Sequence, residues 1–165
     1  MTEHRDSPTN ATQLEEHLRP LEPLLGRTFR GTLTEPDAEK PMVDVSRWER
    51  AMNGMAVRSL HSVNDGEYGG ETIIYWNRER QAIEYFYFTT AGFFTHGTMT
   101  VENGVISSRE AVTGNKNGIT EVVAKSEFLP DGRLRTASQY LQNGRWVEGH
   151  AGTYVPDPTA EVRFR

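Results

Sequence analysis

Short runs of β-branched and aromatic residues alternate with tight-turn signals along most of this chain, and this alternation constrains the fold most strongly. Asn-Gly and Asp-Gly pairs between such runs favour two-residue hairpins, because a type I′ turn needs positive φ at both central residues. The turn signals are Asn53-Gly54, Asp65-Gly66, Arg78-Glu79, Ala91-Gly92, Asn103-Gly104, Asn117-Gly118, Asp131-Gly132 and Asn143-Gly144. A meander of about ten strands either closes or leaves exposed edges. The sequence therefore predicts an all-β fold, a single closed antiparallel up-and-down β-barrel.

The two ends of the chain differ from this repeating pattern. Residues 1–12 are rich in Ser, Thr, Asn, Asp and Pro, which predicts a disordered tail. Four leucines then recur at near-helical spacing: Leu14, Leu18, Leu21 and Leu25. Pro20 and Pro23 limit any helix there to a short N-terminal segment that could cover one end of the barrel. We expect one barrel domain over residues 13–158 and a C-terminal tail over residues 159–165.

Composition excludes several classes of protein. The 165 residues, 36% of them apolar, suffice for one globular domain with one core. A net charge of −5 without a basic cluster argues against nucleic acid or an anionic membrane as the partner. The absence of cysteine excludes disulfides and thiolate chemistry. The polar N-terminus and the lack of a run of about 20 apolar residues predict a cytoplasmic protein.

Two segments resemble a known superfamily. The first, residues 24–32 (Leu-Leu-Gly-Arg-Thr-Phe-Arg-Gly-Thr), resembles the Gly-x-Trp opening of the first strand in lipocalin-like (calycin) barrels. It departs from that pattern by one extra residue and by Phe29 in place of Trp. Residues 69–76, together with residues 84–88, are similar to uncharacterised bacterial members of the superfamily. The resemblance covers roughly residues 24–155. It implies a barrel with a central ligand cavity and no particular reaction.

Hairpin register sorts the side chains into two faces, because side chains alternate along a strand and directly opposed residues share a face. The turns predict these pairs: Trp48 with Ser59, Ser59 with Thr72, Thr72 with Tyr85, Tyr85 with Thr98, Thr98 with Arg109, and Arg109 with Ala124. Opposite-charge pairs such as Glu49 with Arg58 mark the solvent face, on which His150 also falls. The other face supplies the candidate ligand-binding residues: Trp48, His61, Thr72, Tyr85, Tyr87, His96, Arg109 and Tyr140. A single bulge would invert the faces beyond it.

Arg109 is the most informative candidate, because burying an unpaired guanidinium costs several kcal/mol. No acidic residue lies in the neighbouring inward positions except Asp44 near one rim. We therefore expect Arg109, helped by Tyr85 or Tyr87, to meet an acidic group of the ligand. Fatty-acid-binding barrels, which this fold resembles, use an Arg and a Tyr in that way. The alternative is a one-residue slip in register that leaves Arg109 on the surface.

His61 and His96 fall in the same inward row, with Tyr87 between them. They could contact a ligand, act as a general acid/base pair, or serve as axial ligands to a haem. The alternative is that both are hydrogen-bonded within a polar core. Because no third inward ligand accompanies them, the sequence predicts no metal site, and it predicts no cofactor. It identifies no catalytic residues.

The leading functional hypothesis is a binding barrel for a small, partly apolar, acidic molecule. A second hypothesis is a small cofactor-independent isomerase or cyclase that uses the cavity His and Tyr residues as acid/base groups. A third is a structural or interaction module whose barrel is filled by its own side chains. The sequence leaves open whether any reaction is catalysed.

The outward face of the central strands is unusually apolar. The expected patch comprises Ile73, Tyr75, Phe86, Phe88, Met99, Val101 and Ile106. A contiguous patch of this size normally meets a partner, here either the leucine-rich N-terminal segment or a second subunit. We expect a homodimer through Phe86, Phe88 and Met99. The alternative is that the faces are inverted on these strands and the patch is the core.

Overall fold

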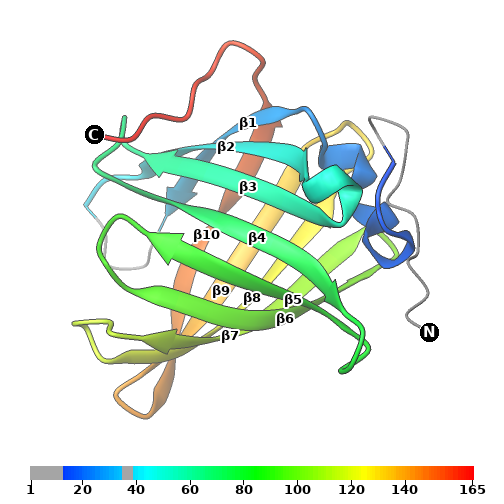
Figure 1. Ribbon diagram of the computed structural model, residues 1–165. Helices are drawn as coiled ribbons and strands as arrows, with labels where there is room; N and C mark the ends of the chain where they lie inside the picture. The colour runs from blue at the N-terminus through cyan, green and yellow to red at the C-terminus, as the bar shows by residue number, and fades with distance from the viewer. Residues whose placement is uncertain (1–12, 35–38) are drawn as a thin grey trace.

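The computed structural model describes residues 13–34 and 39–165. Its strands form a closed antiparallel barrel in which each strand pairs with its neighbours in sequence and β1 pairs with β10 (Figure 1). The strands are β1 (Thr28–Thr34), β2 (Met42–Ala51), β3 (Ala56–Val63), β4 (Tyr68–Asn77), β5 (Ala82–Thr89), β6 (Phe94–Glu102), β7 (Val105–Thr113), β8 (Ile119–Phe128), β9 (Leu134–Gln142) and β10 (Arg145–Pro156). This confirms the up-and-down barrel that the turn spacing predicts.

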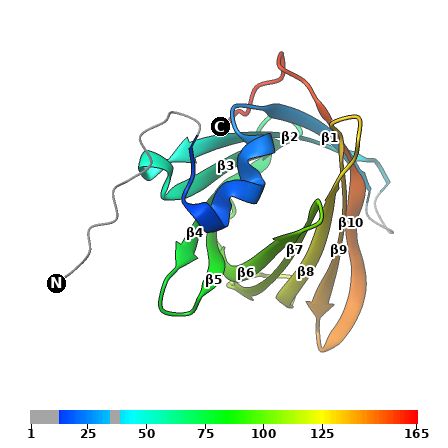
Figure 2. The ribbon, with the colours of Figure 1, turned by 90° about the vertical axis from the view of Figure 1, so that its right-hand side faces the viewer.

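A short helix closes one end of the barrel (Figure 2). This helix, η1 (Glu16–Leu24), is a 3-10 helix that contains both Pro20 and Pro23. Its apolar side chains Leu18, Leu21 and Leu24 are fully buried and, together with Leu14 just before the helix, belong to the core inside the barrel. The short N-terminal helical segment is therefore confirmed. The tail predicted over residues 1–12 lies outside the described residues.

The register of the first hairpins follows the prediction. Trp48 pairs with Ser59, and Ser59 pairs with Thr72. The next hairpin slips by two residues, since Thr72 pairs with Tyr87 instead of Tyr85. A slip of two leaves every side chain on its expected face, because the period of a strand is two residues.

The β5–β6 hairpin slips by one residue and inverts the next two strands. Thr89 lies opposite Phe93 across a three-residue loop, with the Thr89 N–H donating to the Phe93 carbonyl at 3.2 Å. Gly92 ends this loop at φ +85°, the left-handed position that such loops require. Tyr85 therefore pairs with Gly97 instead of Thr98.

A second slip restores the expected faces. Thr98 pairs with Arg109 as predicted, but Arg109 pairs with Val123 instead of Ala124. Each of the two slips by one residue reverses the inward and outward sets, so their effects cancel from β8 onward. Along their whole length, β6 and β7 carry faces opposite to those predicted.

After β10 the chain runs back along the outside of the β3–β4 hairpin. The Arg163 N–H donates to Ser62 Oγ at 3.0 Å, and Arg163 and Arg165 both form ion pairs with Asp65. None of the helices in the described part of the chain has the length and apolar character of a membrane-spanning helix.

Candidate functional site

The barrel encloses a cavity with two lobes. The outer lobe, of about 380 Å³, extends toward the β7–β8 hairpin, and the inner lobe, of about 350 Å³, rests on the core packed against η1. Six residues line both lobes, and we call them the waist: Asp44, His61, Tyr87, Glu110, Thr136 and Tyr154. Each lobe lies within the size range of small-molecule pockets.

Most of the predicted ligand-binding residues line this cavity. These are Trp48, His61, Thr72, Tyr85, Tyr87 and Tyr140. His96 and Arg109 lie on the outer face, because they belong to the two inverted strands. Whether the six lining residues bind a ligand stays a prediction.

The prediction that Arg109 faces inward is wrong. Its side chain is 67% exposed, and its Nη1 forms an ion pair of 3.1 Å with Glu121 Oε1. Arg109 and Glu110 are adjacent on β7, so they face opposite sides and one of the two charges must enter the barrel. Glu110 is the one that enters. The cavity therefore lacks the cation from which an acidic ligand was inferred.

The prediction that His96 faces inward is also wrong. Its ring stacks on Phe86 on the outer face at a centroid distance of 4.3 Å, and its Nε2 lies 3.4 Å from Glu84 Oε2. Glu84 is only 2% exposed and accepts hydrogen bonds from Asn77 and Tyr75. These two donors hold the pKa of Glu84 below its usual value. This outer cluster explains the position of His96 without a ligand.

Inside the barrel, a chain of hydrogen bonds joins residues of five strands, β2, β3, β4, β5 and β10. Asp44 Oδ1 lies 2.9 Å from His61 Nδ1, and His61 Nε2 lies 2.6 Å from the Tyr87 hydroxyl. That hydroxyl lies 2.9 Å from the hydroxyl of Tyr68. Tyr154 donates its hydroxyl proton to the second oxygen of Asp44.

The chemistry of Asp44 sets the direction of these bonds. A carboxylate only accepts, so we assign the ring proton of His61 to Nδ1, which donates to Asp44, while Nε2 accepts from Tyr87. Tyr87 in turn accepts from Tyr68. Burial raises the pKa of both tyrosines, which keeps their hydroxyl protons in place. Tyr68 therefore ends the chain with an oxygen that can accept a hydrogen bond from a molecule in the outer lobe.

Glu110 occupies the waist on the β7 side of the cavity. Thr95 Oγ1 donates to its Oε2 at 2.8 Å, and Tyr85 also forms a hydrogen bond with the carboxyl group. Burial raises the pKa of Glu110. Within residues 13–34 and 39–165, no Lys, Arg or His lies within ion-pair distance of Glu110. The carboxyl group is held by neutral donors alone.

Glycines on neighbouring strands make room for the cavity tyrosines. A Cβ atom at each of these glycines would lie within 2.8 Å of a tyrosine ring atom. The pairs are Gly31 with Tyr154, Gly70 with Tyr87, Gly97 with Tyr85, and Gly149 with Tyr140. The rings can therefore lie along the wall, which directs their hydroxyl groups toward the lumen.

His150 also lines the outer lobe, although the sequence places it on the outer face. A bulge in β10 between Glu148 and Ala151 shifts the register and turns His150 inward. Its Nδ1 lies 2.5 Å from the hydroxyl of Tyr140. Sequence reasoning missed Glu110, Tyr68, Tyr154 and His150. Glycine in the interior of β10, at Gly149 and Gly152, was an available signal of a bulge.

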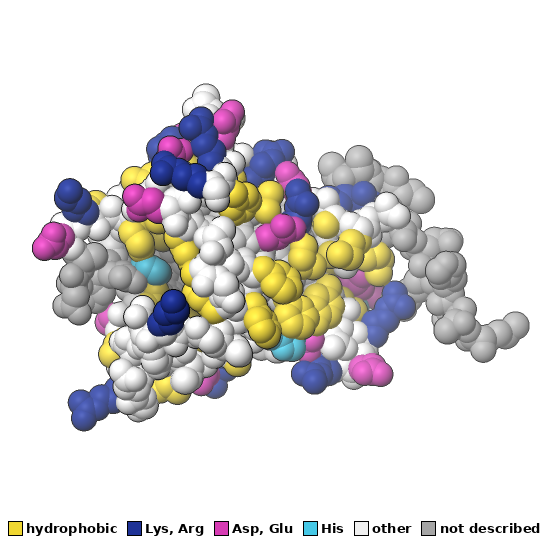
Figure 3. Space-filling model, turned by 60° about the vertical axis from the view of Figure 1, so that its left-hand side comes forward, with side chains coloured by type: hydrophobic (Ala, Val, Ile, Leu, Met, Phe, Trp, Pro, Cys, Tyr) yellow, Lys and Arg dark blue, Asp and Glu magenta, His cyan; other side chains and the backbone are white. Residues whose placement is uncertain are grey.

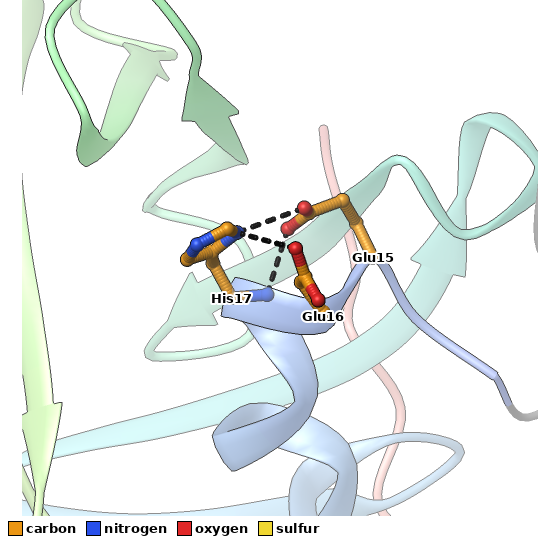
Figure 4. A group of neighbouring side chains, drawn as sticks. All are labelled: Glu15, Glu16 and His17. Carbon is orange, nitrogen blue, oxygen red and sulfur yellow. Dashed lines mark hydrogen bonds and ion pairs between the residues drawn. The ribbon is translucent and has the colours of Figure 1, made fainter. Parts of the chain in front are cut away.

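A group of potential metal ligands lies away from the cavity, at the start of η1 (Figure 4). It comprises Glu15, Glu16 and His17, whose ligand atoms all lie within 4.8 Å of one another. Glu15 accepts from both the backbone N–H and the Nδ1 of His17, and so caps the helix. The His17 ring stacks on Trp76 at 3.7 Å. The helix cap and the ring stacking explain why these three side chains lie together.

The outer faces of β4, β5 and β6 carry a row of aromatic rings. The rings in contact are Tyr75, Phe86, Phe88, Phe94 and His96. Phe88 and Phe94 are 52% and 44% exposed, and Figure 3 shows where hydrophobic side chains gather on the surface. Met99 and Ile106, expected in this patch, instead line the inner lobe, because β6 and β7 are inverted. The homodimer stays a prediction, now without Met99.

Comparison with known proteins supports the fold alone. No protein-family model and no curated protein matches the chain. Among solved structures, the chain is similar to the crystal structure of Rv2717c from M. tuberculosis, with a TM-score of 0.64 and 16% sequence identity. The match covers 88% of this chain and 99% of that one. At this level of identity the similarity shows a shared barrel fold and no more.

Proposed function

We propose that this protein is a small-molecule-binding barrel of the lipocalin-like kind, which holds a partly apolar organic molecule in its central cavity. The observation that carries the proposal is the two-lobed cavity, in which polar groups concentrate at the waist. Trp48, Met99 and Leu134 supply apolar surface to the inner lobe. Mostly apolar walls with a few convergent polar groups are typical of ligand pockets.

The cavity favours binding over an interaction module with a filled barrel. A barrel that only presents its outer surface gains from a packed interior, since voids cost stability. Here the lobes coexist with preorganised hydrogen-bonding groups, which lower the cost of ordering side chains around a ligand.

Blocking the inner lobe tests this function. Ala124 lines the inner lobe, whereas the neighbouring Ala137 on β9 faces outward and is exposed. We expect the fluorescent neutral probe 1-aminoanthracene to bind the parent protein, and to bind Ala124→Phe at least about tenfold more weakly. Ala137→Phe adds the same ring outside the barrel and should leave the affinity unchanged. Equal binding by parent and Ala124→Phe would contradict the proposal, as would no binding by the parent.

A second candidate function, an isomerase, is favoured by the chain from Asp44 to Tyr68. In such a reaction His61 Nε2 is the base. In one concerted step Tyr87 gives its hydroxyl proton to His61, Tyr68 gives its proton to Tyr87, and the Tyr68 oxygen takes a C–H proton from the substrate, so that both tyrosines stay protonated. Asp44 stabilises the imidazolium that forms. Reversal of these transfers returns a proton to a different carbon, so no other reactant is consumed.

Deuterium exchange tests this second candidate. A panel of enolisable ketones in D₂O should exchange C–H protons faster with the parent protein than without it, as followed by NMR. His61→Gln and Tyr68→Phe should lose the acceleration but keep binding of 1-aminoanthracene. If the parent does not accelerate exchange, binding remains as the function.

A further inference from the structure

The charged groups that face the cavity are acidic. Among the described residues that line the two lobes, Asp44 and Glu110 are the carboxylates, and none is a lysine or arginine. Burial is the largest cause of the raised pKa of Tyr68 and of Tyr87, and the charges of both carboxylates raise it further. The electrostatic field at the waist therefore favours positive charge.

Asp44 and Glu110 differ in how their charge is compensated. Both oxygens of Asp44 are engaged, one by the imidazole of His61 and the other by the Tyr154 hydroxyl. Glu110 receives hydrogen bonds from the hydroxyl groups of Thr95 and Tyr85. The imidazole of His61 can take up a proton and so become a cationic partner of Asp44, whereas the hydroxyl donors of Glu110 stay neutral and compensate a buried negative charge less completely than a cation does. Of the two, Glu110 is the carboxyl group that gains most from a positive partner.

The position of Glu110 makes it accessible to a ligand in either lobe. It lines both the outer and the inner lobe, so a group placed at the waist would meet it directly. The apolar body of the same ligand could then occupy the inner lobe against Trp48 and Met99. An anionic group at the waist would instead face two carboxylates, and that repulsion opposes its binding.

We infer that the cavity selects ligands that carry a protonated amine on an apolar body, with the ammonium group paired to Glu110 at the waist. This inference rests on the proposed binding function and names the ligand class for it. Burial supports it by a second route: the raised pKa of Glu110 reflects the cost of ionising the empty site, and a cation offsets that cost.

Ligands matched in shape but different in charge test the inference. Tryptamine, tryptophol and indole-3-acetate share an indole body and end in an ammonium, a hydroxyl and a carboxylate group. Phenethylamine, phenethyl alcohol and phenylacetate repeat the series on a smaller body. At pH 7 we expect at least one amine to bind about tenfold more tightly than its alcohol, and both acids to bind more weakly than their alcohols.

The variant Glu110→Gln tests whether Glu110 binds the ammonium group of the ligand. This variant should lose the advantage of the amine, with about a tenfold loss in amine affinity and less than about a twofold change for the alcohol. Glu121→Gln is the matched control, because it removes an equal charge from the outer face next to Arg109. It should leave all six affinities unchanged. Should Glu110→Gln not fold, the order of amine, alcohol and acid on the parent protein still decides the inference.

The outcomes separate this inference from the binding function. Alcohols that bind the parent as well as amines do, or acids that bind best, would overturn the amine preference while the binding function stands. An amine advantage that survives in Glu110→Gln would overturn the role of Glu110. If 1-aminoanthracene and all six compounds fail to bind, both the function and the inference are wrong.

Discussion

At the scale of single residues, β7 separates two opposite charges by one backbone step. Arg109 lies in solvent beside Glu121, where water screens the pair, while Glu110 lies at the waist among hydroxyl groups. A unit charge therefore has different consequences on the two faces of one strand. Outside the barrel it adds little to stability, and inside the barrel it is costly to ionise.

Arg109→Leu should leave the cavity unaffected. Because the ion pair with Glu121 is exposed, its loss should change the free energy of unfolding by no more than about 1 kcal/mol. The affinity for 1-aminoanthracene should equal that of the parent protein. Urea denaturation and a fluorescence titration measure the two effects. A clear loss of probe affinity would mean that Arg109 reaches the ligand after all.

Glu110→Gln should stabilise the protein increasingly as pH rises. A carboxyl group whose pKa is raised by folding binds its proton more tightly in the folded state. It therefore costs stability once pH rises above about 4, where the unfolded group ionises, and this cost grows until pH passes the folded pKa. Melting temperatures of variant and parent should differ least near pH 4 and most near pH 7. A gap that narrows as pH rises would contradict this account.

At the scale of elements, the length of one loop determines what the cavity contains. The three residues between Thr89 and Phe93, closed by Gly92, set the register of β6 against β5. Through that register the loop places Glu110 inside the barrel and Arg109 outside it. A loop at one rim thus controls the charge at the waist.

Gly92→Ala tests the backbone requirement of that loop. No atom lies within 4 Å of a Cβ at this position, so the cost arises from the positive φ alone. We expect a loss of about 1 kcal/mol in the free energy of unfolding. Gly92→Asn should cost less, because asparagine tolerates the left-handed region better than alanine does. Equal stability of all three proteins in urea would contradict the assigned turn.

The sequence predicts the barrel and most of its lining because turn residues and strand alternation are local signals. Asn-Gly and Asp-Gly pairs indicate where the hairpins lie, and the pairing of Trp48 with Ser59 follows directly from one of them. The residues around Ala91-Gly92 do not determine the length of that loop, since two-residue and three-residue loops both accept glycine. The bulge that turns His150 inward depends likewise on contacts between strands. Both errors are errors of register.

At the scale of the whole molecule, the aromatic row outside β4 to β6 predicts self-association. Light scattering after size exclusion should give a dimer for the parent protein, and Phe88→Glu should give a monomer with an unchanged melting temperature. Val155→Glu, which changes an exposed residue on β10, is the control and should remain dimeric. A parent protein that is monomeric at high concentration would refute the dimer.

Across the whole molecule, the barrel wall, the helix η1 at one end and the polar residues of the waist together surround the cavity. The central claim is that a small molecule binds within it and not on the aromatic outer face. Intermolecular nuclear Overhauser effects between tryptophol and the protein test this directly. We expect contacts with the Trp48, Tyr85 and Tyr87 rings inside the barrel. Contacts confined to Phe88 and Phe94, on the outer face, would contradict it.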